Sequence, residues 1–503
     1  MNKTVKGILA GCGALAVLGG GLAVLKLTEP ETPDDNAAEE DECIDLWEIA
    51  DSEDISSITV ESPEESYTAN RKMETATDSD SDGNVITTEV ANYYLDGYDG
   101  IPMDTLSIRT LATRTATCCA TKCLRTDAAE SDLANYGLDD PITVTFKVDD
   151  SDDVSFLVGD ISPDSTLSYL CKADDKKSIY LVDSTLVEPY RKTILQYLGT
   201  AITDAQAEDD ETIVEDVLIE RKDIDYKMHI VYDDFYQEDQ NGGSSAAHIM
   251  VEPVRSLLNA EKSASATHGL YGMICSEVLI PHPTDADMTK CGLDDPFVRV
   301  TVKTDDGKTQ VFRMGDTYEG KDPVSGEPVT RYYGCLDGID CIYGFSAEDT
   351  VYEDVTPDAI ASKLVFETYV WDIGRLTYKA GDLTLDFDGA GTEQDDYSVT
   401  CNGEETDTER FRLLYTYLLK TSAENILLEP VDMTGVEPMA EIDLKRQDGT
   451  RSYNVKFYDA GGMKAYIALN DNVSFSCRKS YVDTLIANMN IYYETDKEFT
   501  MTW

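Results

Sequence analysis

The pattern with the most specific chemical signal runs from Asp78 to Glu89. Its letters, DSDSDGNVITTE, place acids at positions 1, 3, 5 and 12 and a glycine at position 6, which is the spacing of a calcium-binding EF-hand loop. An EF-hand loop lies between two helices, whereas residues 67–72 and 85–95 alternate in the manner of paired strands. Two interpretations therefore stay open, a calcium site and a solvated hairpin loop, and the flanking strands favour the hairpin loop.

The histidines supply no recognisable site. All four, His229, His248, His268 and His282, fall within one stretch of the chain, and none has a metal-binding spacing such as HExxH. His268 precedes a glycine and His282 lies between two prolines, which is typical of turn positions. The sequence also has no nucleophile elbow, P-loop or kinase motif. We therefore expect no catalytic residue, no cofactor and no bound metal, and a protein that is not an enzyme.

The twelve cysteines follow no zinc-binding spacing, but some of them recur. Cys123 and Cys275 each fall near the end of a predicted helix, while Cys171 and Cys335 each fall in a predicted strand. The last third of the chain lacks both members of this pair, as expected if the two were joined. The recurrence predicts the disulfides Cys123–Cys171 and Cys275–Cys335. Unrelated buried thiols are the alternative.

One short motif occurs three times. Residues 136–141 read YGLDDP, residues 291–296 read CGLDDP, and residues 434–438 read TGVEP. Their glycines lie 155 and then 143 residues apart, which is the spacing of domains. A glycine that can adopt positive φ, a buried aliphatic residue and a proline with fixed φ form a rigid bend before a strand. We therefore interpret the paired aspartates of this motif as turn residues.

A second motif follows the bend at a nearly constant distance. Val158-Gly159-Asp160 places its glycine 22 residues after the first bend glycine, and Met314-Gly315-Asp316 places its glycine 23 residues after the second. The third unit keeps only the acid, in Phe457-Tyr458-Asp459. Asp160 and Asp316 could be paired carboxylates of a glycosidase, but one acid per unit at a turn favours a capping role. The two motifs together predict a threefold repeat.

Alternating apolar and polar residues predict strands on both sides of a helix in the first unit. Asp104 is expected to cap this helix, whose apolar side continues through Cys118, Cys119 and Leu124. A second, closing helix is expected over residues 186–198.

The same order is expected in the other two units. The second unit has a predicted helix over residues 254–279, although its glycines could end it early. In the third unit Thr406 and Glu409 fit a capping box, and a last helix is predicted over residues 481–489.

These elements predict an α+β fold with three tandem repeats, each a mostly antiparallel twisted sheet with one long packed helix. The predicted boundaries are residues 1–27 for an N-terminal transmembrane signal-anchor, 28–43 for an acidic linker, and 44–203, 204–363 and 364–503 for the three repeat units.

The N-terminal segment decides the expected compartment. Residues 7–25 carry no charge and are flanked by Lys3, Lys6 and Lys26. As a helix this stretch would cover about 28 Å, close to the thickness of the hydrocarbon core of a bilayer. A cleaved signal peptide and lipidation of Cys12, which ends a lipobox-like LAGC, are the alternatives. The long apolar run without a good cleavage site favours an uncleaved single-pass anchor with the rest of the chain outside.

The charge of the chain excludes one class of partner. Its net charge is −57 over 503 residues, and such a surface repels the phosphates of nucleic acids. Hydrophobic residues make up 42% of the chain, which is enough for substantial cores. The composition indicates a globular, highly soluble protein that does not bind nucleic acid.

The order of strands, helix, GLDDP bend, alternating strand and VGD motif resembles the domain of unknown function 4340 family. The resemblance covers most of residues 44–500 and is clearest in the first two units, because the third departs in both motifs. It implies an N-terminus anchored in the membrane and, for some members, genes beside ABC-transporter components. No catalytic residues are established for this family, so the resemblance implies none here.

We therefore expect a non-enzymatic, membrane-anchored binding or scaffold protein of the cell envelope, with most of its chain extracytoplasmic. The expected partner is an envelope protein such as an ABC-type permease. A cell-wall hydrolase or glycan-processing enzyme and a calcium-responsive adhesin are the alternatives. A pocket that holds two acids or a His–acid pair would favour the enzyme, and an exposed apolar patch would favour a protein partner.

Overall fold

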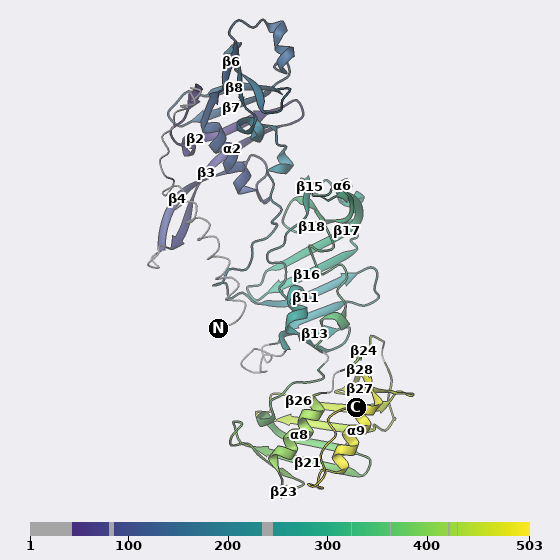
Figure 1. Ribbon diagram of the computed structural model, residues 1–503. Coiled ribbons are helices and arrows are strands. Elements are labelled where there is room, and N and C mark those ends of the chain that lie inside the picture. Colours follow the sequence, from purple (N-terminus) through teal and green to yellow (C-terminus); the bar gives the residue numbers. More distant parts are fainter. Residues whose placement is uncertain are drawn as a thin grey trace, which may run out of the picture. The chain divides into compact units, whose positions relative to one another are not determined.

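The computed structural model describes residues 43–79, 85–233, 245–322, 324–362, 364–420, 423–429 and 431–503. Within this part of the chain, the residues up to Ser66 form one compact unit with Leu111–Arg191, and Tyr67–Thr110 form the other with Lys192–Trp503. Most of the secondary structure is antiparallel β-sheet, in three sheets of eight or nine strands (Figure 1). The predicted antiparallel sheets are therefore confirmed, but the protein is mostly β with some helices.

The first sheet has eight strands in the order β4-β3-β2-β7-β8-β9-β10-β6, and β1 pairs separately with β5. Its helical segments are α2 (Thr105–Ala116), the 3-10 turn η2 (Glu130–Tyr136) and α3 (Ser184–Val187). The strands are β1 (Ile44–Glu48), β2 (Ile55–Glu61), β3 (Ser66–Ser79), β4 (Val85–Leu95), β5 (Thr117–Ala120), β6 (Lys122–Arg125), β7 (Ile142–Val148), β8 (Val154–Ile161), β9 (Leu167–Lys172) and β10 (Asp175–Asp183).

The second sheet has nine strands in the order β14-β13-β12-β11-β16-β17-β18-β19-β15. Its helices are α5 (Ala260–Thr267), α6 (Asp285–Lys290) and α7 (Pro357–Ile360). The strands are β11 (Val214–Arg221), β12 (Met228–Tyr232), β13 (Ser245–Glu252), β14 (Ser256–Asn259), β15 (Glu277–Pro281), β16 (Val298–Thr304), β17 (Thr309–Lys321), β18 (Pro328–Leu336) and β19 (Cys341–Phe345).

The third sheet has nine strands in the order β23-β22-β21-β20-β25-β26-β27-β28-β24. Two helices, α8 (Thr408–Leu419) and α9 (Lys479–Asn490), lie across one face of it (Figure 1). The strands are β20 (Ile373–Ala380), β21 (Leu383–Ala390), β22 (Ser398–Cys401), β23 (Glu404–Glu405), β24 (Asn425–Ile426), β25 (Ala440–Arg446), β26 (Ser452–Asp459), β27 (Lys464–Leu469) and β28 (Asn472–Arg478).

The three sheets share one strand order. When the strands of each sheet are numbered in the order of the sequence, the second and third sheets have the same spatial order of strands. The first sheet has this order too, without the outermost strand. In each sheet a meander of three or four strands precedes a helix, and a second meander pairs beside its first strand.

Burial follows the alternation that the sequence shows. In β25, for example, Ala440, Ile442 and Leu444 are buried while the residues between them are half-buried. Successive side chains of a strand point to opposite faces, so this pattern gives the sheet one well-packed face. The core of the third sheet is rich in aromatic side chains, among them Phe387 and Phe411 with ring centres 4.8 Å apart.

The predicted first helix is correct at its start and wrong at its end. Asp104 accepts a hydrogen bond from the N–H of Ser107 at 3.0 Å, as expected of a cap. The helix ends at Ala116, and Cys118, Cys119 and Leu124 lie in β5 and β6 instead. β-Branched threonines are frequent here, and they favour strands that can pair with β1 and β10.

The long helix predicted over residues 254–279 is also wrong. This segment contains β14, the short α5 and β15. Gly269 and Gly272 have φ values of 73° and 64°, and such left-handed residues end a helix. The closing helix predicted over residues 186–198 consists of α3 and short 3-10 turns, because Pro189 cannot continue an α-helix.

The helices of the third sheet agree better with expectation. The last helix is confirmed as α9. The cap of α8 is one residue later than predicted, because Asp407 accepts from the N–H of Glu409 at 2.9 Å. The hydroxyl of Thr406 instead lies 3.0 Å from that of Tyr492. Thr406 therefore joins the start of α8 to the residues that follow α9.

The predicted anchor over residues 1–27 lies outside the described residues, as does the acidic linker apart from Cys43. Across the described ranges, which begin at residue 43, no helix has both the length and the apolar character needed to cross a membrane.

Candidate functional site

The two repeated motifs meet in the first sheet. Gly137 has a φ of 63° and follows η2, and its N–H donates to the carbonyl of Leu133. A Cβ atom at Gly137 would lie 2.8 Å from the backbone nitrogen of Asp160, and one at Gly159 would lie 2.2 Å from the carbonyl oxygen of Tyr136. Both positions therefore require glycine for close approach of two backbone segments. The constant spacing of the motifs reflects this contact.

The second sheet repeats the contact. Gly292 has a φ of 68°, and the N–H of Asp316 donates to the carbonyl of Cys291 at 2.9 Å. A Cβ atom at Gly315 would lie 2.0 Å from the same carbonyl oxygen. The bend and the second motif are thus two sides of one backbone junction.

The third sheet lacks this junction. Gly435 also has a positive φ, of 78°, but no atom lies within 4 Å of the position that its Cβ would take. Without a backbone segment packed on it, the glycine of the second motif is dispensable, and the largely buried Tyr458 takes its place. The degraded third copy of both motifs therefore has one structural cause.

Beneath each junction lies a small apolar cluster. In the first sheet Leu138 packs with Leu133 and Cys171, and in the second Leu293 packs with Cys291 and Cys335. The aliphatic residue of the bend therefore covers the strand cysteine. Burial raises the pKa of the Cys171 and Cys335 thiols to about 11, so both stay protonated and unreactive at neutral pH.

The acids of the two motifs lie at the surface and have local partners. The Asp294 carboxylate accepts from the hydroxyl of Thr289 at 3.2 Å, and Asp295 pairs with Lys222 at 2.6 Å. Arg191 donates to the carbonyl of Gly159 at 2.5 Å, beside the exposed Asp160. The geometry gives the bend a packing role and brings no pair of these acids into an enclosed pocket.

The predicted disulfides are wrong. Cys123, Cys171, Cys275 and Cys335 are all free thiols. In the first sheet Tyr180 of β10 pairs with Cys123 on one side and with Leu170 on the other, so a whole strand separates the two predicted partners. Two strand spacings amount to about 9.6 Å, and a disulfide spans at most about 7 Å between Cα atoms.

The same obstacle separates the second pair. Cys275 lies two residues before the start of β15, Cys335 lies on β18, and β19 pairs between these two strands. Cys171 and Cys335 do occupy equivalent positions in the two sheets. Their recurrence reflects a small buried position under the bend and not a disulfide.

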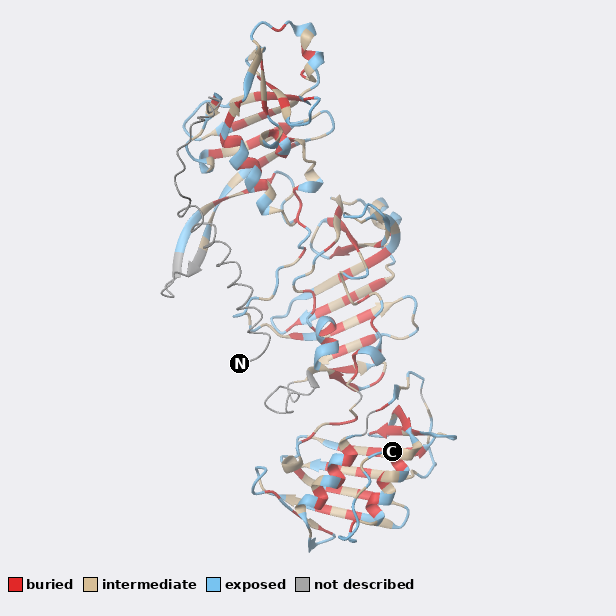
Figure 2. Ribbon diagram, in the orientation of Figure 1, coloured by how far each residue is buried: buried red, intermediate tan, exposed pale blue. Residues whose placement is uncertain are grey.

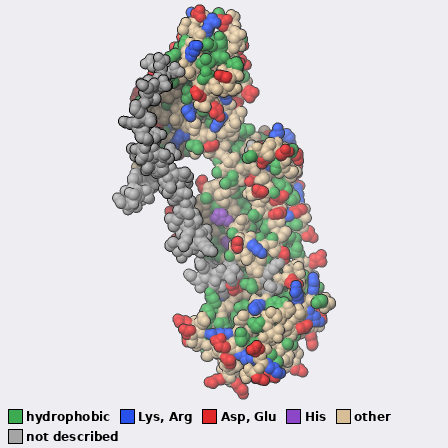
Figure 3. Space-filling view, in the orientation of Figure 1, with side chains coloured by type: hydrophobic (Ala, Val, Ile, Leu, Met, Phe, Trp, Pro, Cys, Tyr) green, Lys and Arg blue, Asp and Glu red, His purple; other side chains and the backbone are tan. Residues whose placement is uncertain are grey.

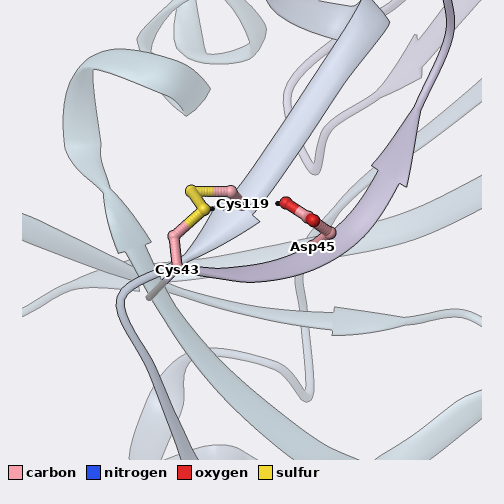
Figure 4. Close-up of a disulfide and its surroundings, with 3 residues drawn as sticks. All are labelled: Cys43, Asp45 and Cys119. Carbon is pink, nitrogen blue, oxygen red and sulfur yellow. Dashed lines mark hydrogen bonds between the residues drawn. A yellow bond between two sulfur atoms is a disulfide. The ribbon is translucent and has the colours of Figure 1, made fainter. Parts of the chain in front are cut away.

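A disulfide joins two other cysteines. Cys43, at the start of the described chain, is bonded to Cys119 of β5, with 5.6 Å between the Cα atoms (Figure 4). The bond fastens β1 to β5 at the point where the predicted linker ends. Sequence reasoning missed it because Cys119 had been placed on a helix and Cys43 had been placed at the end of the acidic linker.

The histidines do not converge. His248 lies on β13 and is mostly buried, and this burial lowers its pKa. His268 caps the C-terminus of α5. The nearest polar or ring partners are Asp216 Oδ2 for His229 Nε2 at 2.8 Å, Val214 O for His248 Nε2 at 2.7 Å, Asp340 Oδ2 for His282 Nδ1 at 2.8 Å and the Tyr271 ring for His268 at 5.8 Å.

Two hollows flank α5. One, of about 380 Å³, is lined by His248 and His268, and the other, of about 400 Å³, by His268, Glu348 and Asp349. The Asp349 carboxylate accepts from the hydroxyl of Ser276 and the N–H of Ser346, both at 2.6 Å. These bonds commit Asp349 to fixing a turn.

A buried polar network joins three strands of the second sheet. The Glu277 carboxylate accepts from Tyr318 Oη at 2.7 Å and from Arg331 Nη1 at 2.5 Å. A Cβ atom at Gly344 would lie 1.9 Å from Tyr318 Oη, so this glycine leaves space for the tyrosine. Burial and the neighbouring carboxylate raise the pKa of Tyr318, which keeps the hydroxyl protonated as a donor. The network cross-links β15, β17 and β18, which sequence reasoning could not bring together.

The EF-hand-like pattern lies on a hairpin. Asp78 and Ser79 end β3, and residues 85–89 begin β4, so the pattern is flanked by two paired strands. Glu89, at the last ligand position of the pattern, accepts from the hydroxyl of Thr75 on the facing strand at 2.8 Å. Residues 80–84 lie outside the described part of the chain. The hairpin interpretation is confirmed for the flanking segments, which are strands where an EF-hand has helices.

Within the described residues, no group of three or more His, Cys, Asp or Glu side chains could hold a metal ion. The surface nevertheless carries many acids, which Figure 3 shows spread over the visible face among lysines and arginines.

The shared strand order of the sheets and the backbone junctions define the class of this protein. It has large antiparallel sheets of one strand order, arranged in tandem along the chain. Comparison with known families is consistent with part of this description. Residues 94–296 match a domain of unknown function (DUF4340), so the chain carries this domain. The match begins near the end of β4 and ends at Pro296 of the second bend, and it includes both complete GLDDP motifs. No curated protein and no solved structure matches the chain.

Proposed function

We propose that the protein is a non-enzymatic binding or scaffold protein, anchored in the cell membrane by its N-terminal segment, with its sheets outside the cytoplasm. In this proposal the three sheets are copies of one repeat unit, and they present sites to an envelope protein such as an ABC-type permease. Repetition of a unit along a chain produces extended binding surfaces, which is the usual use of tandem architectures.

The observation that carries the proposal is the shared strand order of the three sheets. Two sheets with an identical order of nine strands, and a third that differs by one edge strand, are most simply explained by repetition of one unit. The two motifs support the same conclusion, because they form the same backbone junction in the first two sheets.

The disulfide supports the extracytoplasmic location. Cys43–Cys119 lies directly after the predicted linker, and its cysteines are exposed and half-buried. Disulfides persist in oxidising compartments and are rare in the cytosol. Eight of the nine free cysteines of the described chain are buried, where oxidation reaches them poorly.

Co-purification tests the proposal. The full-length chain with a C-terminal affinity tag is crosslinked mildly in membranes of its native host, solubilised and purified. An unrelated tagged single-pass protein is the matched control. We expect one envelope protein in near-stoichiometric amount with this chain and none with the control. Recovery of the chain alone would refute the scaffold proposal.

A further inference from the structure

The outer part of the β3–β4 hairpin, which we call the arm, comprises residues 72–79 and 85–92. Lys72, Met73, Thr87, Thr88 and Glu89 are all exposed. Because successive strand residues point to opposite faces, exposure at consecutive positions means that both faces of the arm are open (Figure 2). Two strands alone are only marginally stable in water, so the arm is an element that would gain from a third strand.

Comparison of the sheets shows where that strand belongs. β4 occupies the rank of β13 and β22, and outside those two strands lie β14 and β23. In the described part of the first sheet β4 is the outermost strand. The segment that corresponds to β14 turns away through Gly97 and Gly100, whose φ values are 84° and 83°, and Met103 pairs with Leu198 instead.

The register shows which backbone groups face this vacant position. The N–H of Asp96 donates to the carbonyl of Thr68 at 2.8 Å, and the 69–95 pairing continues from this pair without a bulge. In an antiparallel ladder, residues alternate between pointing their N–H and C=O groups inward and outward. Even-numbered residues of β4 therefore bond to β3, and odd-numbered residues direct their backbone groups away from it. Of these, Thr87 and Glu89 are exposed whereas Ala91 and Tyr93 are buried, so the open edge lies at residues 87–89.

Within the described residues, the exposed part of this edge lacks the prolines, lysines and bulges that protect many edge strands. Natural edge strands are short, or carry prolines, lysines or bulges that prevent pairing with another chain. β4 has 11 residues, VITTEVANYYL, with one charge and no proline, and all its positions pair with β3 in a regular register. β-Branched and aromatic residues dominate it, and they favour strand pairing.

Charge selects the kind of occupant. The arm contains three acids and one base, within a chain of net charge −57. A second copy of this chain would bring equal negative charge to the edge, and like charges on facing strands are destabilising. An extended segment rich in lysine or arginine is electrostatically complementary.

We propose that the outer edge of β4 accepts an extended basic segment of a partner protein as an additional antiparallel or parallel strand. Main-chain hydrogen bonds from residues 87 and 89 supply the pairing, and the negative charge of the arm and of the chain selects basic side chains. This inference rests on the proposed binding function and names the surface and the partner chemistry through which that function would act.

The test uses a proline at an outward-facing position. Thr87→Pro removes an N–H that faces the edge. The substitution breaks no hydrogen bond between β4 and β3, and proline is tolerated on edge strands in this orientation. Thr87→Val is the matched control, because it keeps the N–H, the charge and the β-branched shape. The probe is a nine-residue peptide of alternating valine and lysine, measured by fluorescence anisotropy against the full-length chain in detergent.

We expect the peptide to bind the wild-type chain and the Thr87→Val variant with equal affinity. Its affinity for the Thr87→Pro variant should be lower by a factor of about ten or more. A twin peptide with N-methyl groups at alternate residues should lose binding to the wild-type chain. The comparison of the two peptides on the wild-type chain remains decisive even if the proline variant misfolds. Equal binding of both peptides, equal binding to all three proteins, or no binding up to millimolar peptide would overturn the inference.

Two further outcomes separate the inference from its alternatives. Dimerisation of the chain in sedimentation equilibrium that Thr87→Pro abolishes would identify a second copy as the occupant and would overturn the basic partner. An envelope partner could also co-purify equally with the wild type and with Thr87→Pro. This result would support the scaffold proposal but show that the partner does not bind the edge of β4. Peptide binding at the edge without any co-purified partner would support the edge and refute the scaffold.

Discussion

Gly137 and Gly159 show how single residues set the spacing of a sequence motif. Each lies where another backbone segment leaves no room for a Cβ atom, and the pair recurs as Gly292 and Gly315. The third unit keeps Gly435 for its backbone conformation alone. The bend glycine therefore has two separable roles, a positive φ and a close contact, and the chain contains a natural control for the second.

Substitution of these glycines separates the two roles. Gly435→Ala should cost about 1–2 kcal/mol, the strain of a left-handed alanine. Gly137→Ala has the same strain and forces the Asp160 backbone away, which adds about 1–3 kcal/mol of overpacking. Urea unfolding followed by hydrogen exchange in β7 and β26 measures each value in its own sheet. Equal costs at the two positions would contradict the role of the junction.

His248 links stability to pH. Its Nε2 lies 2.7 Å from the carbonyl of Val214, which can only accept, so this nitrogen carries the hydrogen. Burial lowers the pKa of His248 below the value of about 6.5 that it has when unfolded. The unfolded chain therefore binds the proton more readily, and the stability that neutral His248 contributes is present above pH 6.5 and declines as the pH falls below it.

Comparison with His248→Gln isolates this contribution from that of the many carboxylates. The free energy of unfolding of the wild type should fall more steeply than that of the variant between pH 7.5 and 5.5, as measured by urea denaturation. Parallel slopes for the two proteins would show that His248 does not titrate in this way.

At the scale of elements, α8 and α9 are joined by a buried arginine. Arg410 of α8 donates to the carbonyls of Tyr492, Ile491, Glu494 and Lys497, at 2.5 to 3.1 Å. These carbonyls follow the end of α9, where the helix dipole also favours a positive charge. A single guanidinium thus satisfies four carbonyl groups of the segment that follows α9.

Arg410→Lys should therefore destabilise the third sheet although it keeps the charge. A compact ammonium cannot reach four separated carbonyls, and the expected loss is about 2–4 kcal/mol. Arg412→Lys is the control on the same helix. Arg412 pairs with the exposed Glu409 and donates to one carbonyl, that of Gln394, so its replacement should cost about 1 kcal/mol or less. Thermal unfolding and hydrogen exchange of residues 491–503 measure both, and similar losses would refute the special role of Arg410.

Element boundaries also show what a sequence can predict here. Residues 142–148 alternate strictly, and they form β7 with the bounds expected from that pattern. β5, β6, β14 and β15 have four or five residues each, and they exist because a neighbouring strand pairs with them. Their patterns are too short to distinguish from the helices predicted in their place, since only tertiary pairing decides between them.

At the scale of the whole molecule, the order of motifs along the chain predicted similar antiparallel sheets in tandem, and the structure has three sheets of one strand order. The spacing of Gly137 and Gly159 reports a contact that every copy with both motifs must keep, so it survives in the sequence. The partners of Cys123 and Cys171 depended on which strands are adjacent. That information is absent from local patterns, and the predicted disulfides were therefore wrong.

The arm was likewise hidden in the sequence. Residues 78–89 attracted attention as a calcium-binding pattern, whereas the structure directs attention to the edge of the strand that follows. A strand lies at an edge when no other strand pairs with its outer side, and this depends on tertiary structure. Comparison of the three sheets shows that β4 lacks the outer neighbour that β13 and β22 have.

We propose above that the protein acts by holding a partner in the envelope. Quantitative mass spectrometry of the full-length chain, purified after mild crosslinking from membranes of its native host, tests that claim most directly. The account predicts one envelope protein recovered in near-equal amount with the chain and absent from the tagged control. Repeated recovery of the chain alone, under conditions that preserve known membrane complexes of the same cells, would contradict it.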